Sequence, residues 1–168
     1  MQFETLFRPA RENPVSIALI GAGEFGMSLI AQSRRMQGLV VKAVADKDLD
    51  RVASTLAGMG IAARRCDSAA AAQSAVAVGE MALCESVSDL LTLPIDMIVE
   101  ATGDAEAGAR FALAAIEAGR GVTMVTKEAE CVVGPVLAAK ARAAGVPYTL
   151  VEGDQPALLI GLISWART

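Results

Sequence analysis

A glycine-rich turn between an apolar run and a helical pattern constrains this chain more than any other feature. The turn reads Gly21-Ala22-Gly23-Glu24-Phe25-Gly26, a G-x-G-x-x-G sequence. It directly follows the apolar run Val15 to Ile20, and it opens a helical pattern that continues from Glu24 to Gln37. A buried strand, a turn with this spacing and a helix together predict the first βα unit of a doubly wound α/β fold.

Each glycine of the turn has a mechanical reason. Gly21 permits the tight turn, Gly23 lets the backbone approach a pyrophosphate, and Gly26 lets the helix pack closely on the strand. The amides at the helix N-terminus and the helix dipole both favour a phosphate there. We therefore predict an NAD(P) site whose phosphate-binding turn comprises Gly21, Ala22, Gly23, Glu24, Phe25 and Gly26.

An acidic residue stands where the adenosine ribose of such a cofactor would lie. Asp46 comes twenty positions after Gly26, at the end of a second apolar run from Leu39 to Ala45. Its carboxylate can accept hydrogen bonds from ribose hydroxyls and repels a 2′-phosphate, which favours NAD over NADP. Lys47 beside it can offset that repulsion, so the choice between the two cofactors stays open. We predict both residues to be cofactor contacts.

The rest of the chain alternates between strand and helix patterns. Further strands are predicted at 39–45, 82–85, 96–101, 122–125 and 147–151. Helices are predicted at 49–57, 69–77, 88–93 and 105–118, at a helix opened by Gly134-Pro135, and at 157–166. Residues 61–90 show the least regular pattern. The alternation predicts an α/β fold, a doubly wound parallel sheet of the Rossmann type, with helices on both faces.

Two loops after later strands carry further candidates, because ligands of open parallel sheets lie at the carboxyl ends of the strands. Thr102 and Gly103 follow the strand 96–101 and are predicted to contact the nicotinamide ribose. Asp104 beside them suits a helix N-cap, and both roles are compatible. Lys127 and Glu128 follow the strand 122–125 and are the candidate catalytic residues, Lys127 as a cation for a substrate oxyanion or as a proton donor. The alternative is a solvated charge cluster at a helix start.

Three segments are expected. Residues 1–13 form an N-terminal extension, residues 14–152 the dinucleotide-binding domain, and residues 153–168 the start of a helix that connects to a substrate or dimerisation domain. The apolar run Ala157 to Ala166 must pack against something. We therefore expect the native chain to continue beyond Thr168, and we expect a homo-oligomer formed through the C-terminal region.

Composition excludes several classes of protein and site. The net charge of −4, with dispersed basic residues, argues against nucleic-acid binding. The absence of histidine excludes Ser-His-Asp and Cys-His catalysis and a His-ligated metal. The three cysteines, Cys66, Cys84 and Cys131, have no C-x-x-C spacing, so no metal site is expected, and free thiols suit a reducing cytoplasm. No run reaches membrane-span length. The expected partner is a small-molecule substrate.

The motifs above resemble the N-terminal domain of homoserine dehydrogenases. The resemblance rests on the strand, the glycine turn and the strand-end aspartate, with Glu100-Ala101-Thr102-Gly103 and Val125-Thr126-Lys127. It implies that Lys127 corresponds to a lysine near the nicotinamide, and that Glu152 corresponds to a glutamate after the last strand.

The stretch from Glu152 to Arg167, together with Gly21 to Gly26, more closely resembles a divergent group. These are homoserine dehydrogenase-like proteins with a C-terminal SAF domain, some described as 1-deoxy-D-xylulose 5-phosphate reductoisomerase-like enzymes that use NADPH. This implies an NADP(H)-dependent oxidoreductase whose substrate domain lies C-terminal to the present segment. Two alternatives remain: a stand-alone regulatory NAD(P)-sensing Rossmann module, and a methyltransferase that binds S-adenosylmethionine.

Overall fold

The computed structural model describes residues 12–151 and 155–167 of the 168-residue chain. The strands are β1 (Val15–Ile20), β2 (Leu39–Ala45), β3 (Ala63–Cys66), β4 (Met81–Cys84), β5 (Met97–Glu100), β6 (Gly121–Met124) and β7 (Tyr148–Leu150). The helices are α2 (Glu24–Ser33), α3 (Leu49–Gly58), α4 (Ala69–Ala77), α5 (Val87–Leu91), α6 (Ala105–Glu117), α7 (Lys127–Ala144) and α8 (Gln155–Ala166).

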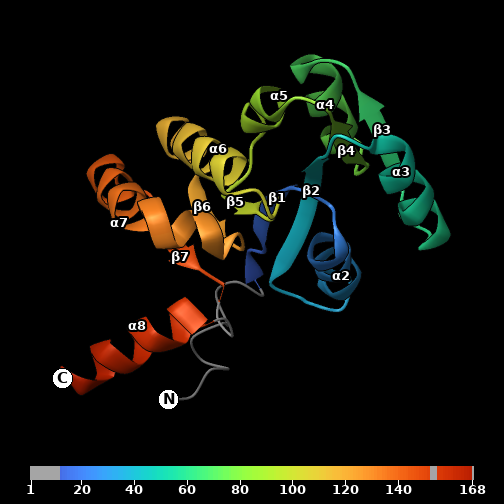
Figure 1. Cartoon of the computed structure of the whole chain (residues 1–168). Helices are drawn as coiled ribbons and strands as arrows, with labels where there is room; N and C mark the ends of the chain where they lie inside the picture. The colour runs from blue at the N-terminus through green and yellow to red at the C-terminus, as the bar shows by residue number, and fades with distance from the viewer. Residues whose placement is uncertain (1–11, 152–154, 168) are drawn as a thin grey trace.

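The seven strands form one sheet in the order β3-β4-β2-β1-β5-β6-β7, and each neighbouring pair is parallel (Figure 1). The chain winds outward from β1 to one edge of the sheet, returns to β5 beside β1, and winds to the other edge. The strand order therefore reverses between β1 and β5, which is the point where ligands bind in open α/β sheets. The predicted doubly wound parallel sheet is confirmed.

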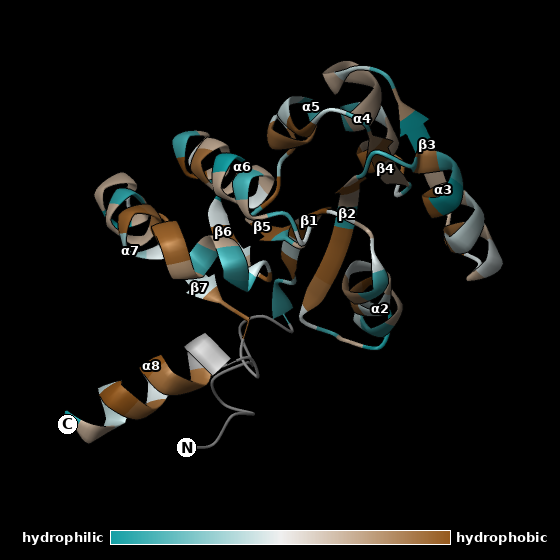
Figure 2. Ribbon diagram, in the orientation of Figure 1, coloured by the Kyte–Doolittle hydropathy of each residue, from teal (hydrophilic) through white to brown (hydrophobic). Residues whose placement is uncertain are grey.

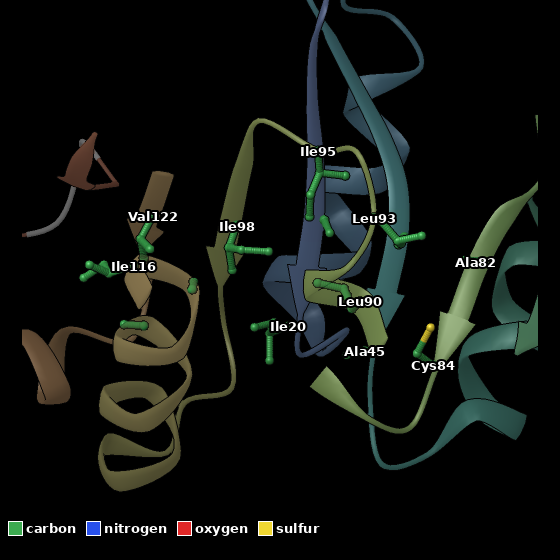
Figure 3. Close-up of a cluster of buried hydrophobic side chains, with 14 of the residues drawn as sticks. Ile20, Ala45, Ala82, Cys84, Leu90, Leu93, Ile95, Ile98, Ile116 and Val122 are labelled. Atoms are coloured by element: carbon green, nitrogen blue, oxygen red, sulfur yellow. The ribbon is translucent and has the colours of Figure 1, made fainter. Parts of the chain in front are cut away.

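Both faces of the sheet carry buried apolar side chains, because alternate residues of a strand point to opposite faces. On one face, Ile20 and Ile98 belong to a cluster that α4, α5, α6 and α7 cover, with Leu90 among its members (Figure 3). On the other face, Leu19 and Val44 pack with residues of α2 and α3. The central strands β1, β4 and β5 are short and mostly apolar, as burial on both faces requires.

One predicted helix start is wrong. The pair Gly134-Pro135 was expected to open a helix, but α7 already begins at Lys127 and carries Pro135 in its interior. Proline removes one backbone donor, and in this helix that loss does not end the helix. The end of α7 agrees with its sequence, because Gly145 caps it in the left-handed conformation with φ 70°.

A second difference is β3, which the irregular region 61–90 concealed. Its sequence, Ala63-Arg64-Arg65-Cys66, lacks the apolar run of a buried strand because β3 lies at the edge of the sheet. The arginine side chains there form ion pairs, Arg64 with Glu80 and Arg65 with Asp50. Charged side chains are a common way to protect an edge strand.

The C-terminal helix α8 differs from the others in its surroundings. Its side chains are strongly hydrophobic, and it projects from the β7 end of the sheet (Figures 1 and 2). Within residues 12–151 and 155–167, no helix has the length and apolar character needed to cross a membrane. The predicted extension 1–13 and the residue Glu152 lie wholly or almost wholly outside the described residues.

Candidate dinucleotide-binding site

The turn after β1 packs directly on the loop after β5. Gly21 has φ +91°, a conformation that L side chains rarely adopt. A Cβ on Gly21 would lie 2.6 Å from the Ala101 carbonyl oxygen and 2.9 Å from Thr102 Cα. Backbone thus approaches backbone across the switch point, and only glycine fits at this position.

Gly26 allows a second close approach, between α2 and β1. A Cβ there would clash with the Gly21 carbonyl oxygen and would lie 2.8 Å from the Leu19 Cδ2. The helix therefore starts directly above the strand that precedes it. This geometry agrees with the packing role that the sequence predicts for Gly26.

Gly23 has a different environment. It is the N-cap of α2, with φ −69° and no side-chain cap, and a Cβ built on it meets no atom within 4 Å. By contrast, α3 and α6 have N-terminal amides bound by Asp48 and Asp104. Among the residues that the structure describes, the first amides of α2 therefore have no side-chain acceptor, and they lie beside open space at the positive end of the helix dipole. These residues fit a phosphate group.

Asp46 holds the glycine turn in place. Its Oδ2 accepts a hydrogen bond from the Ala22 N–H at 2.7 Å, and its Oδ1 accepts one from the Asp48 N–H at 2.8 Å. The side chain is only 10% exposed. The carboxylate predicted to bind the ribose thus also fixes the backbone that would bind the phosphates.

Arg51 completes this network and was not identified from the sequence. Its guanidinium donates to the Ala22 carbonyl oxygen at 2.9 Å and pairs with Asp46 Oδ2 at 3.4 Å and with Asp48 at 3.8 Å. Its position in the first turn of the helix after the strand-end aspartate is the only signal the sequence gives. The arginine offsets part of the charge of Asp46.

A cavity of about 330 Å³ opens beside this network, within the size range of small-molecule sites. Four of the predicted residues line it together: Gly21, Asp46, Lys47 and Thr102. The remaining lining residues are Ile20, Ala45, Glu85, Val87, Asp104, Ala107 and Phe111. The cavity therefore combines an apolar interior with three carboxylates and one lysine. Phe25 does not line it and is 40% exposed on another side of α2.

The loop after β5 is held by a buried glutamate. Glu100 is completely buried, and its Oε1 accepts hydrogen bonds from the Thr102 N–H at 2.9 Å and the Thr102 hydroxyl at 2.6 Å. Its Oε2 has no hydrogen-bond partner within residues 12–151 and 155–167. Room for this carboxyl comes from Gly108 of α6, where a Cβ would lie 3.0 Å from Oε2. Glu100 therefore fixes the position of Thr102.

The backbone of Gly103 is held in place by a threonine that follows the next strand, β6. It has φ +71°, and its N–H donates to the Thr126 hydroxyl at 3.0 Å. Thr126 is buried and precedes α7, so the loops after β5 and β6 are joined at the carboxyl edge of the sheet. Asp104 caps α6 by accepting from the Ala107 N–H at 2.8 Å, as the sequence suggests.

The two candidate catalytic residues lie at this same edge. Lys127 and Glu128 are exposed in the first turn of α7, directly after Thr126. They do not belong to the residues that line the 330 Å³ cavity. A site that includes them would extend from that cavity along the edge, past Gly103, toward β6.

A second, partly buried contact to a carboxylate joins β7 to α7. The Tyr148 hydroxyl donates to Glu130 Oε2, and Gly134 makes room for the Glu130 carboxyl, which a Cβ at that position would contact. Burial is the main cause that raises the pKa of Tyr148, with the hydrogen bond and charge of Glu130 as further causes. The tyrosine therefore stays protonated and joins β7 to α7.

No protein-family model and no curated protein sequence matches the chain. Solved structures do match. The WlbA dehydrogenase from Bordetella pertussis, in complex with NADH and UDP-GlcNAcA, is 18% identical with a TM-score of 0.59, over 83% of this chain and 37% of that one. Biliverdin reductase from a Synechocystis species, in complex with biliverdin and NADP+, is 17% identical with a TM-score of 0.59, over 82% and 38%.

A homoserine dehydrogenase from Thiobacillus denitrificans is 24% identical with a TM-score of 0.58, over 82% of this chain and 29% of that one. The chain thus spans less than two fifths of the length of each of these three proteins. At these identities the likeness shows the fold. The chain thus has a Rossmann-type α/β fold, which it shares with these dehydrogenases and this reductase.

Proposed function

We propose that this chain is the NAD(P)-binding domain of an oxidoreductase that transfers hydride between a nicotinamide and a small carbonyl or alcohol substrate. One observation carries the proposal. The first amides of α2, which have no side-chain cap, lie beside open space at Gly23, next to a cavity at the switch point of the sheet. A pyrophosphate is the ligand that such a helix N-terminus suits.

The adenosine half of the cofactor would occupy the 330 Å³ cavity. Val87 and Phe111 offer apolar surface for the adenine, and Asp46 stands at the end of β2 for the ribose hydroxyls. Structures with this fold that contain NADH or NADP+ support a nicotinamide cofactor.

We favour NAD over NADP. Three carboxylates, of Asp46, Glu85 and Asp104, line the cavity, whereas Lys47 is the one cation among the described residues that line it. This charge balance disfavours a 2′-phosphate, which would add about two negative charges. The resemblance to NADPH-dependent enzymes argues in the opposite direction, and a direct comparison of the two cofactors decides between them.

The nicotinamide half would lie along the carboxyl edge, over Thr102 and Gly103. Glu100 and Thr126 hold these two residues and act as positioning residues. Lys127, one residue after Thr126, would bind the substrate oxygen on which charge changes during hydride transfer, with Glu128 as a second candidate. Bound cofactor supplies the hydride chemistry, and the protein orients it. The proposal includes that the oxidoreductase is homoserine dehydrogenase-like.

Calorimetric titration with NADH and NADPH in parallel tests the proposal on three proteins. Gly23→Val places a side chain in the space proposed for the pyrophosphate, at a position where a Cβ meets no described atom within 4 Å. Gly58→Val is the matched control, because a Cβ at Gly58 also meets no atom within 4 Å and lies at the far end of α3.

We expect the unmodified chain and Gly58→Val to bind NADH alike, and Gly23→Val to bind at least about tenfold more weakly, a loss of about 1.4 kcal/mol. NADPH should bind the unmodified chain more weakly than NADH. Binding of neither cofactor, or equal binding by Gly23→Val, would contradict the phosphate site.

A further inference from the structure

Half of one sheet face lacks a covering helix. The helices α2 and α3 pack on one face, over β1, β2 and β4, whereas α4 to α7 pack on the other. Over β5, β6 and β7, on the face that α2 shares, none of the described elements packs as a cover. Parallel sheets are normally covered on both faces, since their strands are apolar on both sides.

An apolar groove of about 530 Å³ marks this bare half. Val15 and Ile17 of β1, Leu29 of α2, Val99 of β5 and Val151 after β7 line it, with Met36 at the end near the start of the strands. Thr123 supplies the only polar side chain among the lining residues. Because parallel sheets are normally covered on both faces, an apolar groove on this uncovered half indicates a missing packing partner.

The helix α8 carries exposed apolar side chains on more than one side, including Leu159, Ile160 and Ile163, and one of these sides suits the groove. Leu158, Leu162 and Trp165 are spaced i, i+4 and i+7 and therefore form one stripe along the helix. They are 60%, 60% and 75% exposed. A helix that carries this much exposed apolar surface is stable in water only when the surface is buried.

Chain connectivity and length favour the chain's own helix as the occupant. Val151 lines the groove, and only residues 152–154 separate it from α8. Loops of this length are usual in βα units, whose helices fold back along the sheet. A helix of 12 residues is about 18 Å long, and a strand of six residues, such as β1, is about 20 Å long.

We propose that α8 of the same chain folds back into this groove, antiparallel to the strands, with the stripe of Leu158, Leu162 and Trp165 against the sheet. This direction places the start of α8 at the carboxyl edge and Trp165 near Met36 at the opposite edge. The docked helix completes the second layer over β5 to β7.

The chain's single tryptophan reports on this docking directly. We would record the emission wavelength of Trp165 and its quenching by acrylamide over a wide range of protein concentration. Met36→Glu places a charge in the groove where Trp165 is expected, at a side chain that is already 54% exposed, so the fold is retained. Val136→Glu, at a 57% exposed position on α7, is the matched control.

The proposal predicts blue-shifted, poorly quenched emission that does not change on dilution, a red shift in Met36→Glu, and no shift in Val136→Glu. Emission of a solvent-exposed tryptophan in the unmodified chain would overturn it. A blue shift that disappears on dilution would also overturn it, since the occupant is then the α8 of a second copy. Equal emission from Met36→Glu and the unmodified chain would place α8 elsewhere.

A cross-link gives an independent measurement. In a Cys131→Ser background, whose remaining cysteines are buried, Met36→Cys and Leu162→Cys are combined and treated with a short bismaleimide. We expect cross-linked monomers. Cross-linked dimers, or no reaction between the pair, would contradict docking within one chain.

Discussion

The turn at Gly21 makes a quantitative prediction about stability, because three glycines of the site separate two physical effects. Gly21→Ala combines a strained φ of +91° with a Cβ only 2.6 Å from a backbone oxygen. Gly103→Ala has the strain alone, with φ +71° and no atom within 4 Å of the Cβ. Gly23→Ala has neither, since its φ is −69° and the space is open.

The expected losses of unfolding free energy follow from these differences. Left-handed strain costs about 1–2 kcal/mol, and forcing an extra carbon into a filled site costs about 1–3 kcal/mol. Gly21→Ala should therefore lose about 2–5 kcal/mol, Gly103→Ala about 1–2 kcal/mol, and Gly23→Ala no more than about 1 kcal/mol, the cost of alanine in place of glycine at an N-cap. In a chain of this length, 3 kcal/mol corresponds to a fall in Tm of about 6–12 °C.

Urea unfolding followed by far-ultraviolet circular dichroism measures all three variants under the same conditions. The order Gly21→Ala, Gly103→Ala, Gly23→Ala, from least to most stable, is the expected result. Equal stability of Gly21→Ala and Gly103→Ala would refute the close backbone approach at the switch point. A large loss in Gly23→Ala would refute the open space from which the phosphate site is inferred.

Three further predictions concern charge. The Ser16 hydroxyl and N–H both donate to Asp96 at 2.7 Å, and these hydrogen bonds lower the pKa of that carboxyl. The stability that this carboxylate contributes is present above about pH 4 and should be lost as the pH falls through the lowered pKa. In Asp96→Asn, the stability should fall less over the same pH range. Because the pKa of Tyr148 is raised in the folded chain, the stability that its protonated form contributes is present below about pH 10 and is lost as the pH rises further. Absorbance of the chain's single tyrosine should show phenolate only when the chain unfolds at alkaline pH. Tyr148→Phe should remove this part of the pH dependence. Glu85→Lys should strengthen NADPH binding about tenfold while changing NADH binding little, because it makes the charge lining the cavity less negative. Equal changes for both cofactors would contradict the argument from charge balance.

The sequence predicted the features that depend on residues close together in the chain. The glycine turn, the strand before it and the helix after it are adjacent in sequence, and their spacing alone indicated the first βα unit. Asp46 was identified because the distance from the turn to the end of the second strand is a regular property of this fold. The structure then brought Gly21, Asp46, Lys47 and Thr102 to one cavity.

Features that depend on tertiary contacts were missed. The contact between Gly103 and Thr126 joins residues that are 23 positions apart, and it exists because β5 and β6 are neighbours. Glu100 occupies a strand position where an apolar residue would be expected to be buried. The sequence pattern therefore could not predict that this carboxyl is buried or that it accepts hydrogen bonds from Thr102. The edge strand β3 has no apolar run that could reveal it in the sequence, and it becomes recognisable only through its pairing with β4.

The central claim is that a dinucleotide binds across the switch point of the sheet, with its phosphates at the start of α2. The most direct test is a titration of the isotope-labelled chain with NADH, followed residue by residue through amide chemical shifts. We predict the largest shifts at the amides of Gly23 to Gly26, with further shifts at Lys47 and Thr102 and small shifts in β3. Shifts that are absent, or that cluster away from the glycine turn, would contradict the claim.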